Sequence, residues 1–134
     1  MAVDMNMKVL IVGDYKTMLR IVNNLLRQLV FQNVSEATEG GVALEMLRKE
    51  PYGLVTSGWN MESMTGIELL RTVRADPTLK TVPFIMVTAE SKVENVQTAV
   101  AAGVNNYIVK PFNADTLRMK IEKVLGPLPN PAAA

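Results

Sequence analysis

The sequence predicts an open α/β fold in which helices cover both faces of a parallel sheet. Short β-branched runs alternate five times with helical stretches within about 120 residues, and parallel strands need such crossover helices. The first run, Lys8 to Val12, is continuously apolar, as is typical of a strand buried on both faces. A closed eight-stranded barrel would need roughly 250 residues. The chain has 134, which favours the open sheet.

Each strand-and-helix unit is indicated by its apolar spacing. After the first strand, one apolar helix face is formed by Met18, Val22, Leu25, Leu26 and Leu29. We expect the further strands at 34–37, 52–57, 84–88 and 105–109. We expect their helices at 42–49, 66–75, 92–102 and 113–125, with Gly103 suited to a C-cap and Asn113 to an N-cap.

Domain organisation follows from the ends of this pattern. A single domain is expected over residues 7–125, preceded by an extension over 1–6. Residues 126–134 contain one Gly and three Pro and are expected to form a disordered tail. No apolar run reaches the roughly 18 residues of a membrane span, and the start has no export signal, so a cytoplasmic location is expected.

Composition narrows the possible chemistry. The chain has no Cys and no His, which excludes a thiol nucleophile, a Cys/His zinc site and a histidine base. The net charge of +1 gives no electrostatic reason to expect nucleic acid or membrane as a partner. Any chemistry must therefore use Asp, Glu, Lys or hydroxyl groups.

Polar side chains follow three of the predicted strands at the edge where open sheets bind ligands. Asp14 follows the first strand, Thr88 ends the fourth and Lys110 follows the fifth. A carboxylate suits Mg²⁺, while hydroxyl and ammonium groups can hold phosphoryl oxygens. The spacing therefore indicates a candidate phosphate and metal site at this edge.

Four sequence blocks resemble the receiver domains of two-component response regulators, in particular the single-domain chemotaxis type. The resemblance runs from about Met7 to Leu125. It rests on VLIVGDY (9–15), WNM with MTG (59–66), MVTAE (86–90) and YIVKPF (107–112). It implies the flavodoxin-like, or CheY-like, (βα)5 sandwich with strand order 2-1-3-4-5.

The resemblance implies a phosphorylation switch. In the family, a histidine kinase phosphorylates an Asp that ends the third strand, and Mg²⁺ binds between acidic side chains and a backbone carbonyl. Asp14, Thr88 and Lys110 match the remaining pocket positions, and the carbonyl of Asn60 matches the backbone metal ligand. Tyr107, together with Ala89 and Glu90, matches the switch and partner face.

Two family positions differ in this chain. Gly58 stands at the phosphoacceptor position and Gly13 stands at the first position of the acidic pair. Because glycine has no side chain, neither residue can accept a phosphoryl group or bind a metal. We therefore expect no catalytic residue, no enzyme activity and no cofactor, with Mg²⁺ binding weak or lost at Asp14 and Asn60.

Several readings of individual residues remain open. Ser57 is expected to point away from the site, and Glu62 is a possible substitute carboxylate from the next loop. Asp14 is either a remnant of the site or simply the N-cap of the first helix. Lys110 is expected in the site with Asp14 as its main carboxylate partner. Restoring Asp at both glycine positions would change the net charge from +1 to −1.

The favoured hypothesis is a degenerate receiver that binds a protein partner, such as a histidine kinase or a flagellar motor component, as a monomer or homodimer. The predicted binding face contains Tyr107 and the helix at 92–102. One alternative is a disabled variant of an ordinary Mg²⁺-dependent, kinase-phosphorylated switch. Another is a phosphorylated switch with weak phosphatase activity that uses Asp14 or Glu62 as its acceptor.

Overall fold

A computed structural model describes residues 6–29, 31–59, 61, 64–88, 92–110 and 112–128. The strands are β1 (Lys8–Val12), β2 (Asn33–Ala37), β3 (Leu54–Ser57), β4 (Phe84–Thr88) and β5 (Asn106–Val109). The helices are α1 (Lys16–Gln28), α2 (Gly40–Lys49), α3 (Gly66–Ala75), α4 (Val93–Ala101) and α5 (Ala114–Leu125). In the described part of the chain, no helix is long and apolar enough to cross a membrane.

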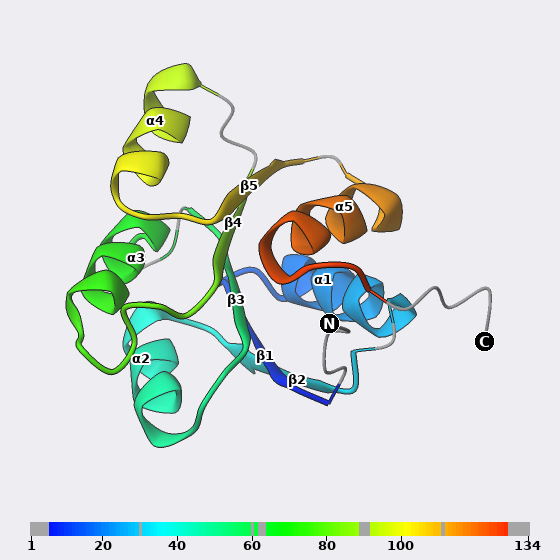
Figure 1. The fold of residues 1–134 in the computed structure, drawn as a ribbon, viewed down its shortest axis with the longest axis horizontal. Helices are drawn as coiled ribbons and strands as arrows, with labels where there is room; N and C mark the ends of the chain where they lie inside the picture. Colours follow the sequence, from blue (N-terminus) through cyan, green and yellow to red (C-terminus); the bar gives the residue numbers. More distant parts are fainter. Residues whose placement is uncertain are drawn as a thin grey trace.

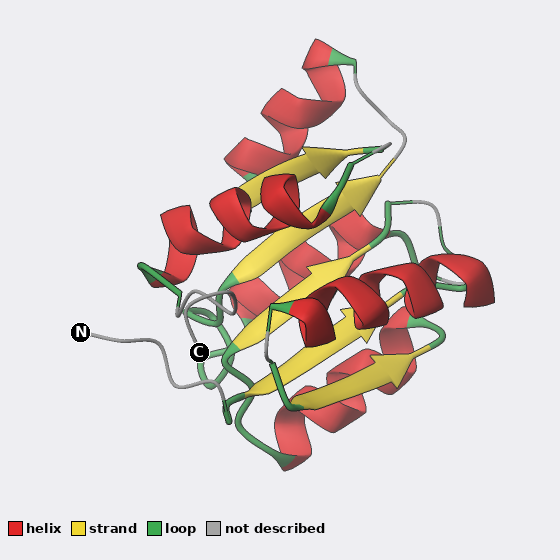
Figure 2. Ribbon diagram, turned by 90° about the vertical axis from the view of Figure 1, so that its right-hand side faces the viewer, coloured by secondary structure: helices red, strands yellow, loops and turns green. Residues whose placement is uncertain are grey.

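The strands form one parallel sheet, as the sequence pattern predicts, in the order β2-β1-β3-β4-β5 that the family resemblance implies. Helices α1 and α5 cover one face of the sheet, and α2, α3 and α4 lie on the other side (Figure 1). Strand pairing brings Val12 of β1 beside Ser57 of β3, and Thr88 of β4 beside Val109 of β5. The residues that follow these strands therefore leave the sheet at one edge (Figure 2).

Alternation of side chains along the strands builds two apolar cores. Val9, Ile11 and Leu54 pack toward α1 and α5, in a core that also contains Met18 and Leu117. The neighbouring residues Leu10, Val12 and Val55 pack into the opposite core, toward α2 and α3. Because Val9 to Val12 of β1 are buried on both faces of the sheet, the continuous apolar run is explained.

The C-terminal segment extends the core beyond the last helix. Leu128, which the sequence places in the tail, is only 6% exposed and packs into the core on the α1 and α5 face. Its N–H donates to Glu122 and its carbonyl accepts from Arg118. The ordered chain therefore continues past Gly126, where the tail was expected to begin, and residues 129–134 lie outside the described part.

Arg74 joins the segments that lead into β4 and β5. Its guanidinium donates to the backbone carbonyls of Val82 and Gly103 at 2.6 and 2.9 Å and to the side chain of Asn105 at 2.7 Å. The Asn105 side chain also accepts from the backbone N–H of Phe84, the first residue of β4. Burial lowers the pKa of the Arg74 guanidinium. The backbone carbonyls of Val82 and Gly103 accept its hydrogen bonds. This cluster positions β4, which ends at Thr88, and β5, which is followed by Lys110.

Candidate functional site

Backbone hydrogen bonds continue the sheet beyond the ends of the strands. The N–H of Gly13 donates to Ala37 and the N–H of Gly58 donates to Val12, each at 3.0 Å. At the other side of the sheet, the N–H of Lys110 donates to Thr88 at 2.9 Å. Because these bonds fix the backbone, the positions of the two glycines and of Lys110 are set by the sheet itself.

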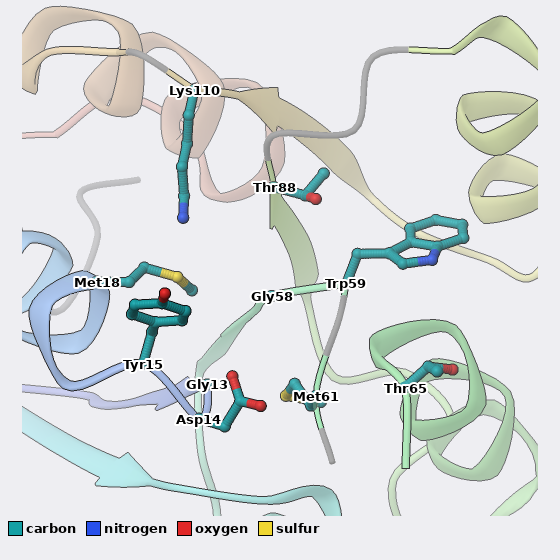
Figure 3. A pocket seen from close by; sticks show the side chains of 10 residues that line it. All are labelled: Gly13, Asp14, Tyr15, Met18, Gly58, Trp59, Met61, Thr65, Thr88 and Lys110. Carbon is teal, nitrogen blue, oxygen red and sulfur yellow. The ribbon is translucent and has the colours of Figure 1, made fainter. Parts of the chain in front are cut away.

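These strand ends surround a cavity of about 450 Å³. Its lining includes Gly13, Asp14, Gly58, Thr88 and Lys110, so the structure brings together the residues that the sequence predicts at the site. Tyr15, Met18, Trp59, Met61 and Thr65 complete the wall (Figure 3). Both glycines are buried, and Thr88 is 4% exposed, whereas Asp14 and Lys110 are exposed.

Met18 occupies the space beside both glycines. A Cβ placed on Gly13 or on Gly58 would lie 3.2 Å from the Cε methyl group of Met18. The side chain of Met18 comes from the first turn of α1 and is buried. The sequence places Met18 only on the apolar helix face. The available signal was its position, since it is the first member of that face and therefore lies nearest the ligand-binding edge.

Gly66 allows α3 to approach the end of β3 closely. A Cβ at Gly66 would overlap the carbonyl oxygen of Gly58, and the N–H of Gly66 donates to Trp59 at 2.8 Å. Thr65 begins the helix, because its hydroxyl accepts from the N–H of Glu68 at 3.2 Å. Sequence reasoning missed this role of Gly66, although glycine at the start of a helix is a signal of close approach.

Asp14 and Lys110 do not form the expected pair. Within the described residues there is no ion pair between them, and they lie on opposite sides of the cavity (Figure 3). The Lys110 side chain extends toward Met18 and Tyr15. The pairing prediction was wrong, and the apolar side chain of Met18, rather than a charged group, lies beside the glycines.

Asp14 is also not the N-cap of α1. The N-cap is Tyr15, whose side chain makes no capping hydrogen bond. Ser57 lies on the face opposite Gly58, as expected, and its hydroxyl donates to the Gly58 carbonyl at 2.9 Å. Asp14 therefore does not cap α1. Ser57 does not face the cavity and is not a substitute for the missing acceptor.

The aromatic residue of β5 is turned inward. Tyr107 is 8% exposed and belongs to the core on the α2 and α3 face. Its ring meets that of Trp59 edge to face, with centroids 6.5 Å apart and an angle of 63° between the planes. Trp59 therefore connects the wall of the cavity to the strand that borders α4.

Some predicted site residues lie outside the described part of the chain. These are Asn60, Glu62, Ala89 and Glu90. Among the residues that are described, no three acidic, His or Cys side chains come together where they could hold a metal ion. Mg²⁺ prefers several carboxylate or carbonyl oxygens, so Asp14 alone among the described side chains of the cavity does not fit it.

The five-stranded sheet and its cavity define a receiver-type domain. The chain belongs to the response regulator receiver domain family, whose model matches residues 9–122. Such domains are regulatory signalling proteins, and this one is of the chemotaxis type found in two-component signalling.

Relatives of known identity agree with this assignment. Chemotaxis protein CheY-3 of Vibrio cholerae is 54% identical over 119 residues, which cover 89% of this chain and 92% of that protein. The structure of CheY4 of Vibrio cholerae has a TM-score of 0.82 at 33% identity, over 90% of this chain and 99% of that one. A receiver domain of a Pseudomonas aeruginosa sensor histidine kinase shares the fold at 23% identity, with a TM-score of 0.82 and coverage of 90% and 98%. That protein holds magnesium in its active-site cleft.

The contact between Met18 and Gly58 is testable by a double-mutant cycle. We expect Gly58→Ala to cost about 1 kcal/mol of unfolding free energy, because the new methyl group displaces Met18. Met18→Ala should cost about 2 kcal/mol by leaving a cavity. In the Met18→Ala background, Gly58→Ala should become neutral or stabilising, since the space is then free. Urea unfolding of the four proteins measures the coupling.

Gly41 in α2 provides the matched control for this cycle. A Cβ there would lie at an ordinary 3.6 Å from the Glu39 side chain, so Gly41→Ala should not couple to Met18→Ala. Effects of Gly58→Ala and Met18→Ala that add to within about 0.3 kcal/mol would contradict the contact.

Proposed function

We propose that this chain is a receiver-fold interaction module of CheY-type signalling that is not switched by aspartyl phosphorylation. The observation that carries the proposal is Gly58 at the end of β3, with the methyl group of Met18 packed beside it. A phosphoryl group needs a carboxylate acceptor at this position, and glycine offers none. The chain therefore keeps the fold of the family without its acceptor.

Loss of the metal site supports the same proposal. Phosphoryl transfer to a carboxylate places several negative oxygens together, and Mg²⁺ normally neutralises them. Gly13 and Gly58 remove two of the carboxylates that the family uses, which leaves Asp14 as the remaining acidic side chain of the described cavity wall. We therefore infer that Mg²⁺ binds here only weakly, with most of its ligands being water. No enzyme activity is part of the proposed function.

The proposed partner face consists of α4, β5 and α5. Exposed apolar side chains occur on these helices, with Val93 67% and Val100 62% exposed on α4 and Met119 57% exposed on α5. A hollow of about 310 Å³ lies beside Tyr107, between Val100 and Lys120. Exposed apolar side chains on the elements of one face support binding of a protein there. We propose a histidine kinase or a flagellar motor component as the partner, bound by a monomer or a homodimer.

The inward position of Tyr107 supports binding without phosphorylation. In receiver switches of this type, an aromatic residue on the fifth strand moves inward when the site is phosphorylated. Here Tyr107 is already buried against Trp59 in a chain without an acceptor at residue 58. The proposed module would then present one form of its binding face at all times.

The retained residues of the cavity favour a second candidate. Thr88 and Lys110 still line it, and the chain is 54% identical to CheY-3 of Vibrio cholerae. These observations are compatible with an ordinary Mg²⁺-dependent switch that has been disabled by two changes, to Gly13 and Gly58. A third candidate, phosphorylation at Asp14 or Glu62, has no such support, because Asp14 and Lys110 lie on opposite sides of the cavity.

Phosphorylation can be tested directly by intact mass. We expect no change in mass when the chain is incubated with a small acyl phosphate and Mg²⁺, because residue 58 has no carboxylate. The variant Gly13→Asp/Gly58→Asp is the positive control and should gain one acid-labile phosphoryl group if the rest of the site is intact. A phosphopeptide from the unmodified chain that contains Asp14 or Glu62 would overturn the proposal.

Partner binding can be tested with the motor switch protein of the source bacterium. The affinity should be the same with and without acyl phosphate and Mg²⁺, since the face has one form. Val100→Glu should weaken binding about tenfold or more by placing a charge in the apolar face. Val42→Glu on α2 is the matched control, because Val42 is a 39% exposed valine far from this face in the fold. Binding that requires acyl phosphate would contradict the account.

A further inference from the structure

A second hollow lies beside the cavity, on the face that carries α1. This α1 groove is lined chiefly by Tyr15, Met18, Ile21, Val22, Lys110 and Phe112, and its volume is about 460 Å³. It runs between the first half of α1 and the segment that follows β5. Tyr15, Met18 and Lys110 also line the cavity described above, so the two hollows meet at these residues.

The lining of the α1 groove is apolar and open to water. Tyr15 is 72% exposed and Ile21 is 50% exposed, although both are large apolar side chains. Phe112 is half-buried and packs against the core on the α1 and α5 face. The exposed apolar residues Val93, Val100 and Met119 are not part of this lining. Covering them with an apolar molecule would be favourable by the hydrophobic effect.

The positively charged side chain of Lys110 lies where the groove meets the cavity. Lys110 is exposed and forms no ion pair with any described residue. Its side chain extends toward Met18 and Tyr15, which places the ammonium group at the junction (Figure 3). Asp14 lies across the cavity and disfavours an anion deeper inside. The electrostatics therefore favour one negative group, held at the end of the groove near Lys110.

The size of the groove is compatible with a small ligand. Pockets for small ligands have volumes of about 300 to 1,000 Å³, and 460 Å³ falls within this range. A stable protein interface would need roughly 800 Å² on each partner, which is a much larger surface than a groove between one helix and one loop offers. The groove is therefore better suited to a small organic molecule than to a protein.

We propose that the α1 groove binds a small organic monocarboxylate with an apolar body. The carboxylate contacts the ammonium group of Lys110, and the apolar body covers Ile21, Phe112 and the ring of Tyr15. This site shares Lys110 and Met18 with the cavity, but it needs neither a phosphoacceptor nor the partner face. It is therefore separate from the proposed function and can fail without affecting it.

Two matched probes test the proposal. The acid probe is 3-phenylpropionate and the neutral probe is its amide, which has nearly the same shape. Each is titrated into the full chain while the methyl signals of Met18 and Ile21 are followed by NMR. We expect saturable shifts at both methyl groups and about threefold or tighter binding of the acid, which is the size of an exposed ion pair. Met119 on α5 should not shift.

Variants separate the charge from the apolar contact. Lys110→Gln should remove the preference for the acid, while Lys80→Gln, which changes an exposed lysine outside the groove, should retain it. Ile21→Ala should weaken both probes alike. The proposal is overturned if neither probe gives a saturable shift, if the acid and the amide bind equally well to the unmodified chain, or if the shifts appear at Met119 instead of Met18 and Ile21.

Discussion

The packing of Met18 against the ends of β1 and β3 is the contact on which the state of the site depends. Gly13 and Gly58 leave room between two neighbouring strands, and the thioether of Met18 fills it from the first turn of α1. A Cβ at either glycine would be 3.2 Å from its methyl group, closer than ordinary packing allows. An apolar group therefore lies beside the two positions that the resemblance assigns to carboxylates, while Asp14 and Lys110 lie on opposite sides of the cavity.

This packing separates two properties that receiver domains usually combine. The fold depends on the buried strands, on the two cores and on the Arg74 cluster, none of which needs a carboxylate at the site. Chemical switching, in the proposal, depends on carboxylates at the positions where this chain has Gly13 and Gly58. Removing like charges from a confined pocket relieves repulsion, so the change is compatible with a stable domain. What remains is a scaffold with an inward Tyr107, an apolar face on α4 and α5, and the α1 groove.

Sequence reasoning was most successful where one local pattern determines the outcome. The apolar run of β1 and the helical spacing of α1 depend on burial alone, and both were predicted within one or two residues. It failed at contacts between distant residues. Three such contacts are the position of Met18, the close approach of Gly66 to Gly58 and the packing of Leu128. Each depends on how helices, strands and loops pack against one another, which the periodicity of the sequence does not specify. Lys110 lines the same cavity as Gly58, but the direction of its side chain depends on its neighbours in that cavity.

The central claim is that the end of β3 no longer holds a phosphoryl group. A crystal structure determined after soaking with Mg²⁺ and beryllium fluoride, a phosphoryl mimic, tests it most directly. The account predicts no beryllium fluoride bonded to the chain, with the Met18 thioether still beside Gly13 and Gly58. Beryllium fluoride bonded to Asp14 or Glu62, with Mg²⁺ beside it and Met18 displaced, would contradict the account.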